Sequence, residues 1–66
     1  MNHIPVSSSN VSSIAYENGV LEVIFHNGYR YQWNIPESIY RELMAASSKG
    51  TFIHTRLKSK YGERKV

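Results

Sequence analysis

Apolar and polar residues alternate in the first half of the chain, and apolar residues recur at helical spacing in the second half. Two Asn-Gly pairs, Asn18-Gly19 and Asn27-Gly28, separate the alternating runs, and this dipeptide tolerates the positive φ values of hairpin turns. The pattern predicts three strands, at about Ser12–Glu17, Val20–His26 and Tyr29–Trp33. Strands joined by such short turns form an antiparallel meander.

The first turn sets the register of the first hairpin. As a two-residue loop it makes Glu17 face Val20 across the two strands. Side chains alternate between the faces of a strand, so this register gathers one apolar stripe, which we take as the core side of the sheet: Ile14, Tyr16, Leu21, Val23 and Phe25.

The second turn decides on which face of the sheet an aromatic row lies; the row consists of Tyr29, Tyr31 and Trp33. A two-residue loop would place this row on the face opposite the core stripe, as a platform on which nucleic-acid bases could stack. A three-residue loop, with Gly28 in the left-handed position of a G1 bulge, makes Phe25 face Tyr29 and adds the row to the core. We favour the second form, because burying three aromatic side chains stabilises a small domain by several kcal/mol at ~25 cal/mol per Å².

The second half predicts two helices. Pro36 and Glu37 suit the first turn of a helix that runs to about Ala46. Ser47-Ser48 ends this helix and caps a second one, from Lys49 to about Tyr61, with Gly62 as the stop. The fold class is therefore α+β, a three-stranded meander packed against two C-terminal helices. The single domain, 1–66, divides into an N-terminal arm (1–10), the meander (11–34), the helices (35–61) and a basic tail (62–66).

Composition limits the class of protein to which this domain can belong. The chain has 66 residues, of which 41% are apolar, and no cysteine, so one small globular domain without a disulfide scaffold is expected. Its apolar stretches are much shorter than the ~20 residues of a membrane span, and its first residues do not resemble a secretion signal. We expect a cytoplasmic protein with no membrane attachment.

Basic residues concentrate in the last third of the chain, although the net charge is only +3. On the predicted second helix, Lys49, Arg56 and Lys60 lie within about 20° of one line along the helix. Such a row could follow a phosphate backbone, or it could be an ordinary solvated edge. The candidate nucleic-acid contacts are Lys49, Arg56, Lys58, Lys60, Arg64 and Lys65, with Tyr29 and Tyr31.

The residues of common catalytic and metal sites are sparse. Three histidines, His3, His26 and His54, lie far apart in the sequence, and there is no aspartate. A Ser-His-Asp set is therefore impossible, and a zinc site is not expected. We predict a non-enzymatic protein with no catalytic residue, metal or cofactor.

Several segments of the chain resemble the KTSC domain family. They are Ile4–Asn10, Tyr29-Arg30-Tyr31 (similar to the family's YxY), Ile35–Tyr40 (VPxxVY), Ala45–Phe52 and Leu57–Tyr61 (IKxKY). The distance from Tyr31 to Pro36 is one residue longer than in the family, so either Tyr31-Gln32-Trp33 is the true match or the strand carries a bulge. Gly62 stands where the family often has Pro, which predicts a looser C-terminal end.

This resemblance implies a small stand-alone bacterial or phage protein, because KTSC domains occur in that form and at the C-terminus of some lysyl-tRNA synthetases. The family's function is unknown, and RNA binding has been suggested for it. Two hypotheses follow: a module that binds RNA or another nucleic acid, and an interaction module that binds a protein or self-associates through a sheet edge or the helices. The sequence leaves the oligomeric state open.

Overall fold

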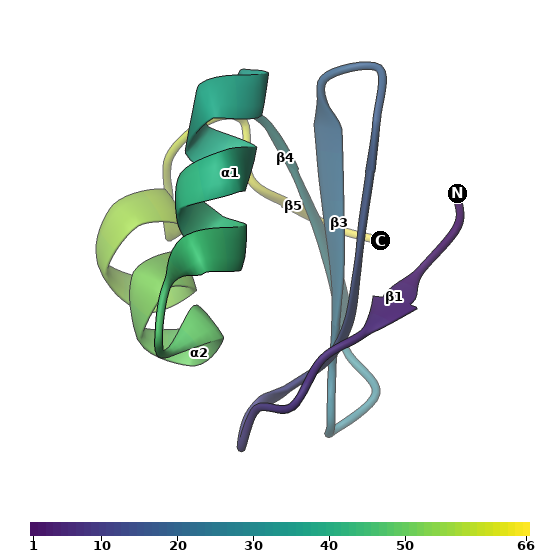
Figure 1. The fold of residues 1–66 in the computed structure, drawn as a ribbon. Coiled ribbons are helices and arrows are strands. Elements are labelled where there is room, and N and C mark those ends of the chain that lie inside the picture. The colour runs from purple at the N-terminus through teal and green to yellow at the C-terminus, as the bar shows by residue number, and fades with distance from the viewer.

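The computed structural model describes residues 1–66, and in it an antiparallel sheet carries helices on one face (Figure 1). The sheet has five strands in chain order: β1 (Ile4–Pro5), β2 (Val11–Glu17), β3 (Val20–Phe25), β4 (Arg30–Asn34) and β5 (Arg64–Lys65). The predicted meander is present as β2, β3 and β4. The prediction of three strands was wrong at both edges, where the N-terminal arm supplies β1 and the basic tail supplies β5.

Both hairpins have the predicted turns. Asn18 (φ 53°) and Gly19 (φ 80°) form the first turn, and Glu17 faces Val20. In the second turn Gly28 has a φ of 90°, and the Phe25 amide donates to the Tyr29 carbonyl at 2.9 Å. The loop therefore has three residues, and the aromatic row lies on the core side of the sheet.

A β-bulge in β2 brings one more apolar residue into the core. Val11 faces Phe25, whereas Ser13 faces Ile24, so the residue between them has no partner of its own across the pair. Because a bulge shifts the alternation by one residue, Val11 and Ile14 both point to the helical side and both are fully buried.

The helical layer consists of α1 (Glu37–Ala45), α2 (Lys49–Phe52) and a π-helical turn, η1 (Ile53–Leu57). The first helix starts where predicted, with Pro36 immediately before α1, and the predicted cap of the second helix is present, because the Ser48 hydroxyl accepts from the Thr51 amide at 3.2 Å. The predicted extension of the second helix to Tyr61 was wrong. No helix is long and apolar enough to cross a membrane.

The chain leaves the helix after Leu57 because a tertiary contact captures the backbone that follows. Ser59 has a φ of 62°, and its amide donates to Glu63 Oε1 at 2.8 Å. The same oxygen accepts from the indole of Trp33 at 3.1 Å. Strand β4 thereby fixes the loop that leads to β5.

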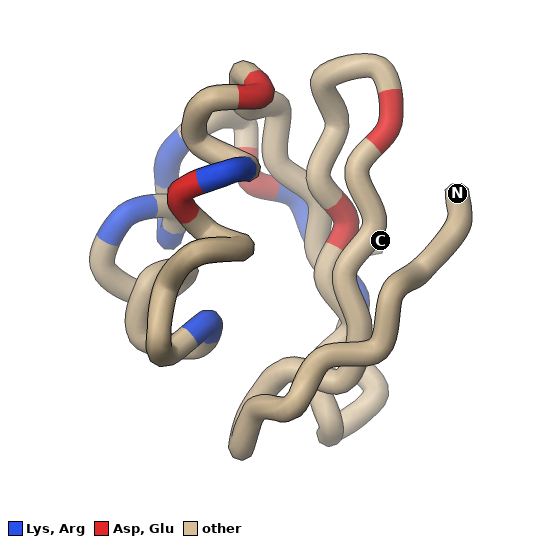
Figure 2. The backbone as a smooth tube through the Cα atoms, viewed as in Figure 1, with Lys and Arg blue, Asp and Glu red and all other residues tan.

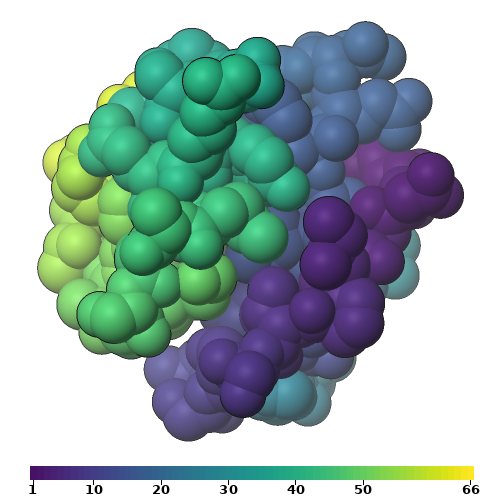
Figure 3. All heavy atoms as spheres, viewed as in Figure 1, coloured from purple at the N-terminus to yellow at the C-terminus, as the bar shows by residue number.

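The core lies between the sheet and the helices. Its fully buried members come from both layers: Val11, Ile14, Leu21, Val23, Trp33, Ile35, Leu43, Ile53 and Leu57. At the surface, the N-terminal arm lies close to the turn between α1 and α2 (Figure 3). Serine side chains from both segments line a small depression of about 180 Å³ between them.

Candidate ligand-binding cleft

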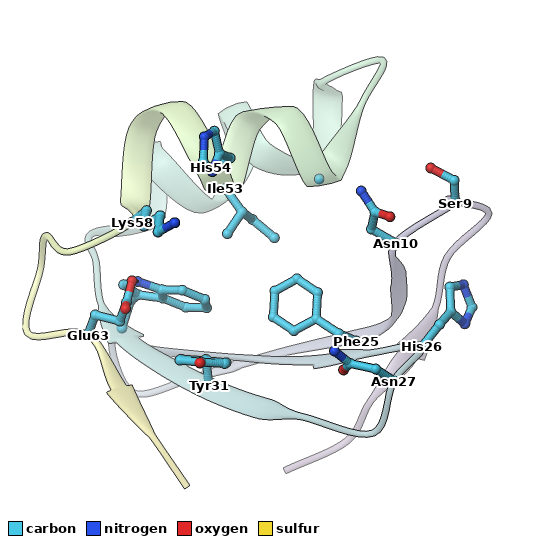
Figure 4. A pocket seen from close by; sticks show the side chains of 12 residues that line it. Ser9, Asn10, Phe25, His26, Asn27, Tyr31, Ile53, His54, Lys58 and Glu63 are labelled. Carbon is cyan, nitrogen blue, oxygen red and sulfur yellow. The ribbon is translucent and has the colours of Figure 1, made fainter.

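A cleft of about 520 Å³ opens between the sheet and the α2–η1 segment. This volume is within the range of roughly 300–1,000 Å³ that is typical of small-molecule sites. Figure 4 shows the side chains of the sheet below it and those of the helix above it. The cleft is lined by Ser9, Asn10, Phe25, His26, Asn27, Tyr31, Trp33, Gly50, Ile53, His54, Lys58 and Glu63.

The floor of the cleft is aromatic. Tyr31 stacks beside Trp33 with 6.0 Å between ring centroids, and it meets Phe25 edge-to-face at 5.9 Å. Trp33 is only 2% exposed, whereas Phe25 and Tyr31 are partly exposed. The row is thus on the core side, as predicted, yet the helices leave part of it open.

Tyr29 departs from the prediction that the aromatic row is buried. It is 50% exposed, because it lies at the hairpin end of β4, next to the edge strand β5. The ammonium of Lys65 lies 3.8 Å from the centre of its ring. A cation at that distance is attracted by the negative face of the ring, so Tyr29 belongs to the surface.

The roof is formed by the first residues of the π-turn η1. Ile53 projects toward the aromatic floor, and His54 and Lys58 lie along the roof (Figure 4). The backbone amide of Lys58 donates to the carbonyl of Ile53 at 2.9 Å, which closes the wide turn. This distortion of the helix lies at the cleft. Single π-turns occur often at functional sites.

One end of the cleft carries a fixed carboxylate. Glu63 Oε1 accepts from Trp33 Nε1 and from the Ser59 amide, while Oε2 makes no hydrogen bond and no ion pair within the protein. Lys58 lies above this carboxylate at the same end (Figure 4). An acceptor and a cationic side chain therefore lie at the same end of the aromatic cleft.

Amide side chains lie at the other end. Asn10 packs against Gly50, where a Cβ would come within 3.0 Å of its amide nitrogen. Asn27 accepts from the Tyr29 amide through Oδ1 at 3.0 Å, which leaves its NH₂ group available. His26 is held by the Ser8 carbonyl at 2.9 Å. The cleft thus offers hydrogen-bonding groups at both ends of its apolar floor.

The predicted row of cations does not form. Lys49 donates to the carbonyls of Met44 (3.1 Å) and Ala46 (2.8 Å), and so caps the C-terminus of α1. Arg56 pairs with Glu42 at 3.1 Å. Lys60 lies beyond the end of η1 and is exposed. The basic segments are spread over the helices, the following loop and the sheet rather than gathered in one strip (Figure 2).

The basic tail is also more ordered than predicted. Arg64 donates to Asn34 Oδ1 at 3.1 Å and to the Gly62 carbonyl at 3.0 Å, and β5 pairs with β4. Gly62, with a φ of 67°, is part of a defined turn rather than of a loose end. Of the eight predicted contact residues, only Lys58 and Tyr31 line the cleft, and Lys65 and Tyr29 lie on the same face of the sheet nearby.

A polar cluster on the opposite face of the sheet was not foreseen from the sequence. His3 bridges Ser13 Oγ (2.9 Å) and Glu22 Oε2 (3.0 Å), and Gln32 donates to Glu22 Oε1 at 2.8 Å. The amide of Gln32 lowers the pKa of the Glu22 carboxyl; burial opposes this, and His3 and Arg30 lower it further. None of these residues lines the main cleft, and the cluster ties the N-terminal arm to the sheet. No group of three or more metal-ligating side chains is placed to hold an ion.

The model of the KTSC domain family matches residues 7–61 of this chain. The chain belongs to the KTSC domain family. The crystal structure of a KTSC domain protein from Yersinia pestis is similar to this domain, with 39% sequence identity, a TM-score of 0.88 and coverage of 98% of this chain and 96% of that one. None of the curated proteins compared with the chain matches it.

The KTSC motif segments can now be placed on the structure. Residues 45–52 and 57–61 contribute Gly50 and Lys58 to the cleft of this KTSC domain, and the central aromatic segment contributes Tyr31. Pairing of β4 with β3 is regular from Asn34 to Arg30, so the alternative of a bulge in β4 was wrong. The regular register favours Tyr31-Gln32-Trp33 as the counterpart of the family's central motif.

Proposed function

We propose that this KTSC domain binds single-stranded RNA, with at least one base in the cleft. The observation that carries the proposal is the partly open aromatic floor of Phe25, Tyr31 and Trp33 in a cleft that Lys58 also lines. Bases of single strands stack on aromatic side chains, and neighbouring cations bind the phosphates. The resemblance to a family for which RNA binding has been suggested points in the same direction.

The charges near the cleft support a path for the strand. Lys58 makes no ion pair within the protein, so its ammonium is available to a phosphate. Lys65 faces Tyr31 across the β4–β5 pair and lies over Tyr29. A strand that leaves the cleft toward Tyr29 would therefore meet a second cation and a second exposed ring. With so few cations, we expect a dissociation constant in the weak range of roughly 10⁻⁴–10⁻⁶ M.

The sheet edges give less support to the alternative of a protein partner. Both edge strands, β1 and β5, contain only two residues. Short edge strands are one of the ways in which proteins avoid pairing with another chain. A protein partner would remain bound during purification from nuclease-treated cells, whereas a partner held through RNA would be lost.

The charge at the cleft can be tested by salt titration. Binding of a fluorescein-labelled single-stranded RNA, measured by anisotropy, should weaken with salt, and Lys58→Gln should lower the slope of log K against log salt by about 0.7 for one lost phosphate contact. Arg41→Gln is the matched control, because Arg41 pairs only with Glu37 on the exposed face of α1. Equal effects of both substitutions, or no complex at low salt, would contradict the proposal.

The aromatic floor gives a separate prediction. Tyr31→Leu keeps an apolar side chain beneath the cleft but removes the ring, and it should weaken RNA binding by about 1–3 kcal/mol, the usual contribution of one base stacked on an aromatic side chain. The salt slope should not change, because no charge is lost. Quenching of Trp33, the single tryptophan, reports binding independently of the label. If Tyr31→Leu bound RNA as tightly as the unmodified protein, the base would lie elsewhere.

A further inference from the structure

If the cleft binds an RNA base, as proposed above, the side chains of its wall influence which base is bound. The inference below rests on that proposed function. Glu63 is the only carboxylate among the cleft residues. Its Oε1 is held by two N–H donors, from Trp33 and Ser59, so the carboxylate cannot turn freely. The second oxygen, Oε2, is a fixed acceptor without a protein partner, beside the aromatic floor.

An ionised carboxylate oxygen accepts hydrogen bonds but cannot donate them. Cytosine and adenine present an exocyclic amino group, which donates, and carboxylates are established partners of the cytosine amino group. Uracil has a carbonyl oxygen at the same position. Two acceptors facing each other in the cleft would each lack a donor. We propose that the cleft selects an unpaired cytosine or adenine and that Glu63 Oε2 reads its exocyclic amino group.

Lys58 complements this selection. Its ammonium lies at the same end of the cleft as Glu63 (Figure 4), and the two side chains form no ion pair with each other. An amino group that donates to Glu63 is next to a ring nitrogen that accepts in cytosine and adenine, so a nearby cationic donor suits the same edge. In uracil that ring nitrogen carries a proton instead.

Cytosine and uracil provide the sharpest comparison, because they have the same size and stacking face. The probes are a short labelled oligouridylate and the same strand with one central cytidine, whose charges are identical. The unmodified protein should bind the cytidine strand about five- to tenfold more tightly. A third strand carries a central pyrimidin-2-one nucleoside, which lacks the amino group and adds no bulk, and it should bind no better than oligouridylate.

Glu63→Gln tests the role of the carboxylate directly. The carbonyl of glutamine can still accept from Trp33 and Ser59, so the loop is kept and the amide NH₂ takes the place of Oε2. An acceptor thus becomes a donor, and the preference should reverse, with oligouridylate bound at least as tightly as the cytidine strand. Trp33 fluorescence and a thermal melt confirm that the variant is folded.

The outcomes separate this inference from the proposed function. If the unmodified protein binds all three strands equally and with the expected salt dependence, base selection is refuted and RNA binding is retained. If cytidine is preferred but Glu63→Gln keeps the same preference, Glu63 does not read the base. If no strand binds at low salt, both the inference and the proposed function are refuted.

Discussion

Leu57→Ala is expected to lower the free energy of unfolding by about 2–5 kcal/mol. Leu57 is fully buried, and it is the last residue of η1 and a member of the single core between sheet and helices. Truncation removes its apolar contacts and leaves a cavity that the surrounding helices and strands fill only in part. In a domain of this size the core rarely contributes more than about 3–5 kcal/mol to the free energy of unfolding. A large fraction of the variant should therefore be unfolded.

The measurement is thermal unfolding followed by the fluorescence of Trp33. A loss of 2 kcal/mol corresponds to a midpoint lowered by about 10 °C or more in a domain this small. Lys60→Ala is the control, since this side chain is exposed and forms no ion pair, and it should change stability by less than about 0.5 kcal/mol. If Leu57→Ala melted at the temperature of the unmodified protein, Leu57 would not be a core residue.

Glu22→Ala is expected to lower the free energy of unfolding by about 2–3 kcal/mol at neutral pH. Glu22 is 8% exposed, and its carboxylate accepts from Gln32 and His3, with Arg30 at 3.6 Å. Removing it leaves several polar groups without their partner on a largely buried patch. It also releases His3, which ties the N-terminal arm to the sheet, so the amide proton of Val6, which donates to the Ser12 carbonyl at 3.2 Å, should exchange faster with solvent.

The same carboxylate predicts a pH dependence. The pKa of Glu22 is lowered from its ordinary value of 4.5, chiefly by the hydrogen bond from Gln32, so the folded protein binds this proton more weakly than the unfolded chain. Its contribution to stability is therefore present above pH 4.5 and is lost as the pH falls through the lower pKa of the folded state.

Urea unfolding at neutral and at acid pH checks this dependence. The difference in stability between the unmodified protein and Glu22→Ala should shrink below the ordinary carboxyl pKa. Glu37→Gln serves as the control, because its exposed pair with Arg41 contributes at most about 0.5 kcal/mol. A difference that stayed constant down to acid pH would show that Glu22 does not act through its charge.

Local chemistry was enough to predict the turns and the central register. Positive φ values are readily adopted at Asn18, Gly19 and Gly28, and the apolar stripe permits only the register that buries it. The cap of the second helix also follows from neighbouring residues, as the bond between Ser48 and Thr51 shows. These features depend on contacts a few residues apart, which is why the sequence determined them.

The end of the second helix could not be predicted in this way. Helical spacing favoured a continuous helix to Tyr61 and, with it, a row of cations. The structure ends the helix at Leu57, because Glu63 binds both the Ser59 amide and the indole of Trp33. A contact between residues 30 positions apart thus outweighs local helical preference, and it disperses the predicted cations.

The sequence by itself determined the α+β class and the antiparallel meander, and it favoured the core side of the sheet for the aromatic row. Only the tertiary structure decided that this row is partly open, that Lys58 and Glu63 lie at one end of it, and that His3, Ser13 and Glu22 form a cluster. The physical reason is the same in each case. Each arrangement joins segments that are distant in the chain, and the distances between them depend on how the helical layer and the arm pack on the sheet.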